Sequence, residues 1–223
     1  AAKGAIENLF TNAQQNRLKF EMLFPQIVHA EMLVQQIPYV HHDYLLGAIP
    51  PVPGMNDEMY QQLAASIGTA YALYEKRNLV RNGTFSAGTG NWHVTEGVEV
   101  QPLQNTAVLV LSEWSHEASQ QVRIDPDRGY VLRVTARKEG RGKGTVTLSD
   151  CAAYTETLTF TSYDYNTSGS QTLTSGTVSG FVTKTLEISP DTEGIRIDIG
   201  ETEGMFKVES VELICMEQME DYL

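Results

Sequence analysis

Four aromatic side chains are the residues of this sequence best suited to binding a ligand. Trp92 and Trp114 each lie beside a segment of alternating apolar residues, and Tyr163 and Tyr165 open a stretch rich in Ser, Thr and Gly. Because an aromatic face can stack on a sugar ring, the four together predict a sugar platform. A Trp beside a strand is more often a core residue, so we expect Trp92 and Trp114 to pack inside and the two Tyr to be the better ligand candidates.

Two groups of residues could coordinate a metal ion. His41, His42 and Asp43 are consecutive, but adjacent side chains on a helix point about 100° apart, so they would chelate poorly. Acidic residues near the end of the chain, Asp198, Glu201 and Glu203, match no calcium-loop motif. We therefore expect no metal and no cofactor, with a structural calcium at the second group as the alternative.

Catalytic machinery is not evident in the pattern. The Gly-x-Ser-x-Gly turn that exposes a catalytic Ser does not occur. The 28 acidic residues are too many to single out a glycosidase pair, and a triad assembled in space stays open. We expect a protein that is not an enzyme, and keep a glycosidase or other hydrolase as an alternative.

The chain contains two cysteines, Cys151 and Cys215. Two cysteines are too few for a disulfide framework, and their spacing excludes a CxxC zinc or redox motif. We interpret them as small buried apolar side chains and leave open whether they pair.

The first part of the chain, residues 1–78, has the spacing of helices. Apolar residues recur every three or four positions, which predicts helices over residues 2–13, from Pro25 to before Pro38, and from an N-cap at Asn56 to Lys76 and Arg77. A short helix at residues 41–46 is an additional expectation, and the Pro-rich segment 49–54 predicts a rigid spacer. We expect a small α-helical bundle.

The second part, residues 79–223, alternates every second position and is rich in Thr, Val and Gly. Nine or ten short strands separated by Gly and Pro turns predict an antiparallel β-sandwich, and more specifically a jelly roll. Its opening string, residues 78–85 followed by Trp92, is typical of a sandwich domain that binds or packs. The predicted fold class is therefore α+β in two domains, 1–78 helical and 79–223 sandwich.

The net charge of −12 is uneven, with five Lys/Arg and seven Asp/Glu in residues 1–78. A field of this sign repels phosphate backbones, so nucleic acid is an unsuitable partner. No apolar run reaches the length of about 18 residues that a membrane helix needs, so we expect no membrane insertion. The sequence begins without Met, in the middle of a helical pattern, which suggests a fragment of a longer protein.

Several strings in this order resemble the carboxyl-terminal half of the large insecticidal crystal (Cry) protoxins. They cover nearly the whole chain except residues 163–180. The strings are residues 8–12, 49–56, 71–74, 78, 82–83, 112–114, 119–123, 129–136, 138–140, 199–204 and 211–213.

The resemblance implies a role that lies outside the toxin itself. In that family the amino-terminal domains form the pore, and the carboxyl-terminal extension drives packing into a parasporal inclusion in the cytoplasm of the sporulating cell. The crystal dissolves in the alkaline host gut, where proteases remove the extension. The resemblance also implies a helical domain followed by a sandwich similar to carbohydrate-binding and galactose-binding modules. Such extensions are often rich in cysteine, and this sequence departs from that pattern.

We therefore expect self-association with other copies of the protoxin in a crystal lattice as the main function. Near neutral pH, Lys and Arg would pair with the abundant carboxylates, and at alkaline pH loss of Lys and Tyr protons would leave repulsion between acidic surfaces. The alternative is a carbohydrate-binding module that recognises gut glycans or receptors, with glycans as its partners. This sequence does not identify the target host.

Overall fold

The computed structural model describes residues 1–37, 55–150, 154–164, 180–201 and 203–216. The chain forms two compact units, Ala1–Tyr74 and Glu75–Leu223, and each is described by itself. The sequence analysis predicted the boundary between the two domains a few residues later, between residues 78 and 79.

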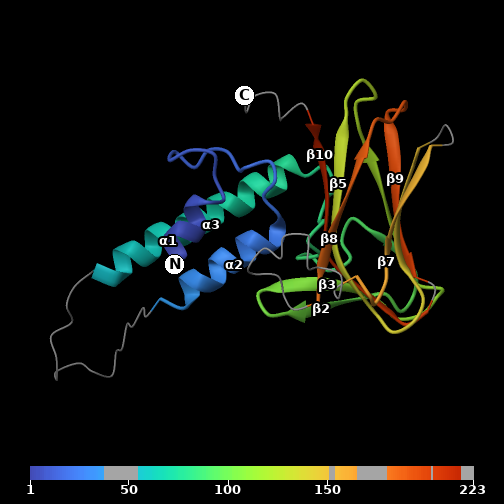
Figure 1. The fold of residues 1–223 in the computed structure, drawn as a ribbon, viewed down its shortest axis with the longest axis horizontal. Coiled ribbons are helices and arrows are strands. Elements are labelled where there is room, and N and C mark those ends of the chain that lie inside the picture. The colour runs from blue at the N-terminus through green and yellow to red at the C-terminus, as the bar shows by residue number, and fades with distance from the viewer. Residues whose placement is uncertain (38–54, 151–153, 165–179, 202, 217–223) are drawn as a thin grey trace. The chain divides into compact units, whose positions relative to one another are not determined.

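The first unit contains helices α1 (Ala2–Glu7), α2 (Phe24–Gln35) and α3 (Met55–Arg77), the last of which ends in the second unit (Figure 1). Pro25 lies in the first turn of α2 as predicted, and the Leu23 N–H there donates to Gln26 Oε1 at 2.7 Å. The Phe24 ring packs 5.4 Å from the Tyr74 ring. These contacts join α2 to α3 around one apolar core, while the predicted bundle geometry stays a prediction.

Two details of the predicted helices were wrong. The helix expected over residues 2–13 ends at Glu7, because the chain then turns back to form a bridge between Phe10 and Leu18. Both side chains are buried there. Their apolar side chains therefore belong to a loop that packs on the core and not to a continued helix. The third helix already begins at Met55, one residue before the predicted N-cap Asn56. The helix expected at 41–46 and the spacer at 49–54 lie outside the described residues.

The second unit is a sandwich of two five-stranded antiparallel sheets, with strand orders β1-β4-β9-β6-β7 and β2-β3-β10-β5-β8 (Figure 1). The sandwich prediction is therefore confirmed. The strands are β1 (His93–Val94), β2 (Glu99–Leu103), β3 (Thr106–Leu111), β4 (Glu117–Arg123), β5 (Tyr130–Glu139), β6 (Gly144–Asp150), β7 (Thr155–Phe160), β8 (Val182–Ile188), β9 (Gly194–Glu201) and β10 (Met205–Cys215).

Alternating side chains of both sheets fill the sandwich core, as the period-two pattern predicts. Phe160 of one sheet packs 5.5 Å from Phe206 of the other. Gly144 lies where any Cβ would overlap the Phe206 ring, so the start of β6 requires glycine. Strand β3, which lies between β2 and β10, is buried over its last four residues.

The segment from Leu79 to Asn91, read from the sequence as the start of the strands, forms turns instead, and the first strand begins at His93. Asn82, Phe85 and Asn91 have positive φ values of 50°, 56° and 67°. Such conformations do not occur in a strand. Side-chain hydrogen bonds hold this segment against the sandwich.

Candidate functional site

The string that opens the second unit is fixed to strand β10 by one side chain. Asn78 is buried, and its Oδ1 accepts hydrogen bonds from the N–H groups of Val80 at 3.0 Å and Leu213 at 2.9 Å. Its Nδ2 donates to the Val211 carbonyl at 3.0 Å. The side-chain amide thus satisfies backbone groups that another strand would otherwise satisfy.

Asn82 and Gly83 hold the rest of this segment. The Asn82 Nδ2 donates to the carbonyls of Gly88 and Gly90 at 2.9 and 2.7 Å, and its carbonyl accepts from Trp92 Nε1 at 3.1 Å. Gly83 packs so closely on β10 that a Cβ would overlap the Val211 carbonyl oxygen. The opening string, residues 78–85, was expected to belong to a domain that binds or packs. In the structure its side chains and backbone attach this segment to the sandwich.

Two carboxylates three positions apart on β10 are the most unusual chemical groups of the sandwich. Glu209 lies at a β-bulge, where the register with β5 shifts between Val208 and Ser210. Its side chain is 1% exposed, and its Oε2 has no hydrogen-bond partner in the part of the chain that the structure describes. Burial raises the pKa of Glu209 to about 7.

Glu212, in contrast, is surrounded by cations. The Arg77 Nη2 lies 2.6 Å from its Oε1, and the Arg133 Nη1 lies 3.7 Å from its Oε2. Burial raises the pKa of Glu212, and the charges of Arg77 and Arg133 oppose that shift. Sequence analysis did not single out this pair, because a regular alternating strand places residues three positions apart on opposite faces and gives no reason to expect both in the interior. Arg133 lies directly opposite Glu212 on β5, a pairing that becomes visible only once the strand register is known.

The four predicted ligand residues have different fates. Trp92 is 7% exposed and packs 5.5 Å from Phe85, so its ring has no free face for a sugar and the expectation that it is a core residue holds. Trp114 was expected in the core for the same reason, which is wrong, because it is 77% exposed. Tyr163 is 74% exposed. Tyr165 lies outside the described residues.

Trp114 and Tyr163 lie at the same end of one sheet without being neighbours. Trp114 precedes β4 and Tyr163 follows β7, and the start of β4 and the end of β7 are at the same end because β9 and β6 pair between them. Three strand spacings separate β4 from β7, about 14 Å. That separation is too large for both rings to stack on one sugar ring.

The predicted metal groups remain without support. His41, His42 and Asp43 fall in a part that the structure does not describe, as does Cys151. Within the described ranges no three His, Cys, Asp or Glu side chains come together as a metal site, and Asp198 pairs with Arg196 at 2.7 Å. The calcium alternative stays a prediction. Among the helices that the structure describes, none combines the length and apolar character that a membrane span requires.

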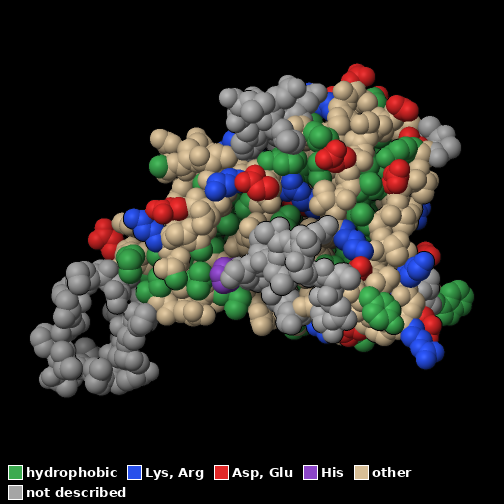
Figure 2. All heavy atoms as spheres, in the orientation of Figure 1, with side chains coloured by type: hydrophobic (Ala, Val, Ile, Leu, Met, Phe, Trp, Pro, Cys, Tyr) green, Lys and Arg blue, Asp and Glu red, His purple; other side chains and the backbone are tan. Residues whose placement is uncertain are grey.

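Oppositely charged side chains are interspersed over the surface in view (Figure 2). Many of them pair within the chain, mostly at positions open to solvent. These pairs are Lys3–Glu7, Arg123–Glu193, Arg128–Asp125, Arg137–Glu139, Lys184–Asp164, Arg196–Asp198 and Lys207–Glu139. Cations that already have an internal partner are less available to a neighbouring molecule, which leaves the acidic excess exposed.

Two tyrosines are protected from alkaline titration. Tyr130 is buried, and its hydroxyl accepts from the Asp125 N–H at 2.8 Å and donates to the Asp125 carbonyl at 3.0 Å. Burial raises the pKa of Tyr130, and burial also raises the pKa of Tyr154. Alkaline deprotonation of these two Tyr therefore begins above the usual range.

Sequence comparison relates the chain to pesticidal crystal proteins. The family model described as Cry1Ac, domain VII, matches residues 84–162. The chain is 48% identical over 217 residues to the pesticidal crystal protein Cry4B protoxin and to Cry4Aa of Bacillus thuringiensis subsp. israelensis. It is 43% identical over 218 residues to Cry7Ab of Bacillus thuringiensis subsp. dakota. These matches cover 97% to 98% of this chain but only 17% to 18% of the relatives.

Comparison of folds relates part of the chain to sugar-binding modules. The module TmCBM61, solved in complex with β-1,4-galactotriose, has a TM-score of 0.45 at 17% identity, over 62% of this chain and 99% of that chain. A CBM4 structure has a TM-score of 0.42 at 14% identity, over 61% of this chain and 99% of its own. Likenesses of this size carry no conclusion about a ligand.

Proposed function

Since this chain corresponds to the carboxyl-terminal region of the pesticidal crystal protoxins, we propose that it promotes the packing of a protoxin into a crystal inside the cell and its dissolution at alkaline pH. In this proposal the chain has no toxic and no catalytic role. It resides in a parasporal inclusion, reaches the host gut with the ingested crystal, and is removed there by gut proteases. The similarity over 97% of the chain to proteins named as crystal proteins carries the proposal.

The charge balance supports the alkaline part. The chain has 28 acidic and 16 basic side chains, so each copy repels the next unless cations offset the field. Lys184 and Lys207 form pairs with Asp164 and Glu139, and pairs of this kind are the contacts that the proposal expects alkaline pH to weaken. Each exposed pair contributes only ~0–1 kcal/mol, so release would come from many small losses together. Because burial raises the pKa values of Tyr130 and Tyr154, these two of the ten Tyr would contribute less to the change.

Solubility of the chain against pH tests the charge mechanism. We expect solubility to rise from pH 7 to pH 11, and added salt to raise it at pH 7 because salt screens contacts between charges. A flat profile over this range would argue against the mechanism. Deletion of this region from a parent protoxin tests the role itself, since inclusions that form and dissolve unchanged without it would contradict the proposal.

A second candidate function is glycan binding by the sandwich, which the two exposed rings of Trp114 and Tyr163 favour. Titration with galactose and xylose oligosaccharides, followed by Trp fluorescence, tests it. Binding that is lost in Trp114→Ala or Tyr163→Ala and kept in the wild type would support this function. No signal at millimolar sugar would remove it.

A further inference from the structure

Trp114 is exposed on a turn that the buried side chain of His116 stabilises. The imidazole of the buried His116 accepts a hydrogen bond at Nδ1 from the Ser112 backbone N–H at 3.2 Å. The backbone N–H of His116 donates to the Glu113 backbone carbonyl at 2.8 Å. Gly97, with φ of 91°, lies so close to the imidazole that a Cβ would overlap it. A rigidly presented Trp loses little entropy on binding, which is the property of an interface anchor.

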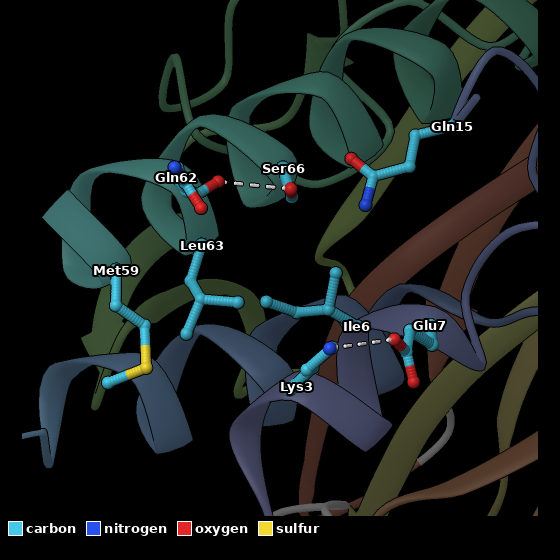
Figure 3. Close-up of a pocket in the computed structure, with 8 residues that line it drawn as sticks. All are labelled: Lys3, Ile6, Glu7, Gln15, Met59, Gln62, Leu63 and Ser66. Atoms are coloured by element: carbon cyan, nitrogen blue, oxygen red, sulfur yellow. Dashed lines mark hydrogen bonds and ion pairs between the residues drawn. The ribbon is translucent and has the colours of Figure 1, made fainter. Parts of the chain in front are cut away.

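A hollow of about 300 Å³ in the first unit has the chemistry to receive such a ring. Ile6 of α1 and Leu63 of α3 point toward one another across it, with Met59 beside them (Figure 3). Met59 is 44% exposed, and a thioether makes favourable contacts with aromatic rings. The volume is at the lower limit of pockets that hold small molecules, so it suits a single aromatic side chain better than an oligosaccharide.

Polar and charged groups around the hollow complement the Trp114 turn. Gln15, Gln62 and Ser66 also line it, and their oxygens could accept the indole N–H (Figure 3). Lys3 forms a loose pair with Glu7 at 3.8 Å, with both side chains more than half exposed. Glu113, next to Trp114, is 71% exposed and lies 4.0 Å from His116 Nε2. Because the pair with Glu7 is the longest of the surface pairs named above, Lys3 is the cation among them most open to a second carboxylate, such as Glu113.

We propose that Trp114 of one copy inserts into the hollow between α1 and α3 of a second copy, with Glu113 beside Lys3. This inference rests on the proposed self-association and names its contact surface. The two surfaces differ, so a copy that uses its Trp114 turn still has a free hollow, and a copy that uses its hollow still has a free Trp114 turn. Such a head-to-tail contact can repeat from copy to copy, and it forms an open chain unless the rotation between copies closes it into a ring.

Two single variants and their mixture test the contact in the 223-residue chain by sedimentation velocity at neutral pH. Trp114→Ala removes the ring, and Ser66→Phe fills the hollow from its rim. We expect each variant alone to dissociate at concentrations at least tenfold above those at which the wild type does, because anchoring Trp residues dominate interfaces. A 1:1 mixture keeps one intact surface on each partner and should form dimers but no longer species.

Matched controls use residues of the same kind outside the contact. Tyr163→Ala removes another exposed aromatic ring of the sandwich, and Gln61→Phe adds a ring to α3 at an exposed position that does not line the hollow. Both should associate like the wild type. Thermal melts that match the wild type show that each variant folds, and Trp114→Phe gives a milder change should the Ala variant unfold.

Fluorescence distinguishes a contact between copies from one within a copy. Trp92 and Trp114 are the two Trp residues, and the Trp114→Ala variant gives the signal of Trp92 alone. Acrylamide quenching of Trp114 should fall as concentration rises. Protection at all concentrations would overturn the proposal. Equal association of wild type and both variants would overturn this contact alone, whereas a wild type that never associates would contradict the proposed function as well.

Discussion

Glu209 and Glu212 of β10 lie three positions apart, and both are almost fully removed from water. Glu212 faces two guanidinium groups, while Glu209 has an oxygen without a partner among the described residues. Burial raises the pKa of both, so burial alone does not distinguish them. The difference is in the partners: one site is built for a charge, and the other tolerates a carboxyl group best when it is protonated.

The largest expected effect comes from removing the charge that is paired. Glu212→Gln leaves Arg77 and Arg133 buried beside a neutral group, and breaking a buried pair in this way costs about 3–5 kcal/mol. Urea denaturation at pH 7 measures the loss. The matched control is Glu139→Gln, which removes a partly exposed carboxylate paired with Lys207 at 3.0 Å and should cost less than about 1 kcal/mol. Equal losses at the two positions would show that the cations do not depend on Glu212.

The same substitution at Glu209 should have the opposite sign above neutral pH. Burial raises the pKa of Glu209 from its ordinary value of 4.5, which applies in the unfolded chain, to about 7 in the folded one. Its stabilising contribution is therefore complete below pH 4.5 and is lost as pH rises through 7, a total of about 3 kcal/mol. Glu209→Gln removes this dependence, so its stability relative to wild type should rise by that amount between pH 4.5 and 8.

Urea denaturation at several pH values measures this difference, with the exposed Glu117→Gln as control. Wild-type and Glu209→Gln stabilities that run parallel from pH 4.5 to 8 would contradict the assignment. The window lies mostly below pH 7, so Glu209 adds little to any response at alkaline pH. Any alkaline response under the proposed function would therefore have to come from other groups, such as the charges on the surface.

The sequence predicted the strands well because the period of two survives wherever the sheets are regular. It failed where local structure interrupts that period. The bulge at Glu209 removes one residue from the register with β5, and no residue type in the string around it announces a bulge. A polar residue in such a strand is read as solvent-facing, so neither buried carboxylate could be found without the partners that the fold brings together.

The two Trp residues illustrate a second limit. Both lie beside strands, and propensity treats them alike. Trp92 follows a turn closed by the side chain of Asn82, which directs its ring inward. Trp114 lies between Glu113 and Ser115, in a turn where His116 Nδ1 accepts from the Ser112 N–H. Polar neighbours were no usable signal, because Trp92 also lies between polar residues, Asn91 and His93. The hydrogen bonds that separate the two become visible only in three dimensions.

The smallest effect is expected at the exposed pair of Arg196 and Asp198. It tests whether the pair of Arg77 and Glu212 on β10 is strong because it is buried or because its atoms are close. Arg196 Nε lies 2.7 Å from Asp198 Oδ1, nearly the same separation as the 2.6 Å between Arg77 and Glu212, but its side chains are 52% and 37% exposed. Asp198→Asn should change the free energy of unfolding by less than about 1 kcal/mol, and less still at high salt. Urea denaturation at low and high salt measures it beside Glu212→Gln. If the exposed pair cost as much as the buried one, geometry alone would decide the strength of these pairs. If it costs little, as we expect, burial is what makes the pair on β10 strong, and the exposed pair is weak enough for salt to release it while the pair on β10 persists.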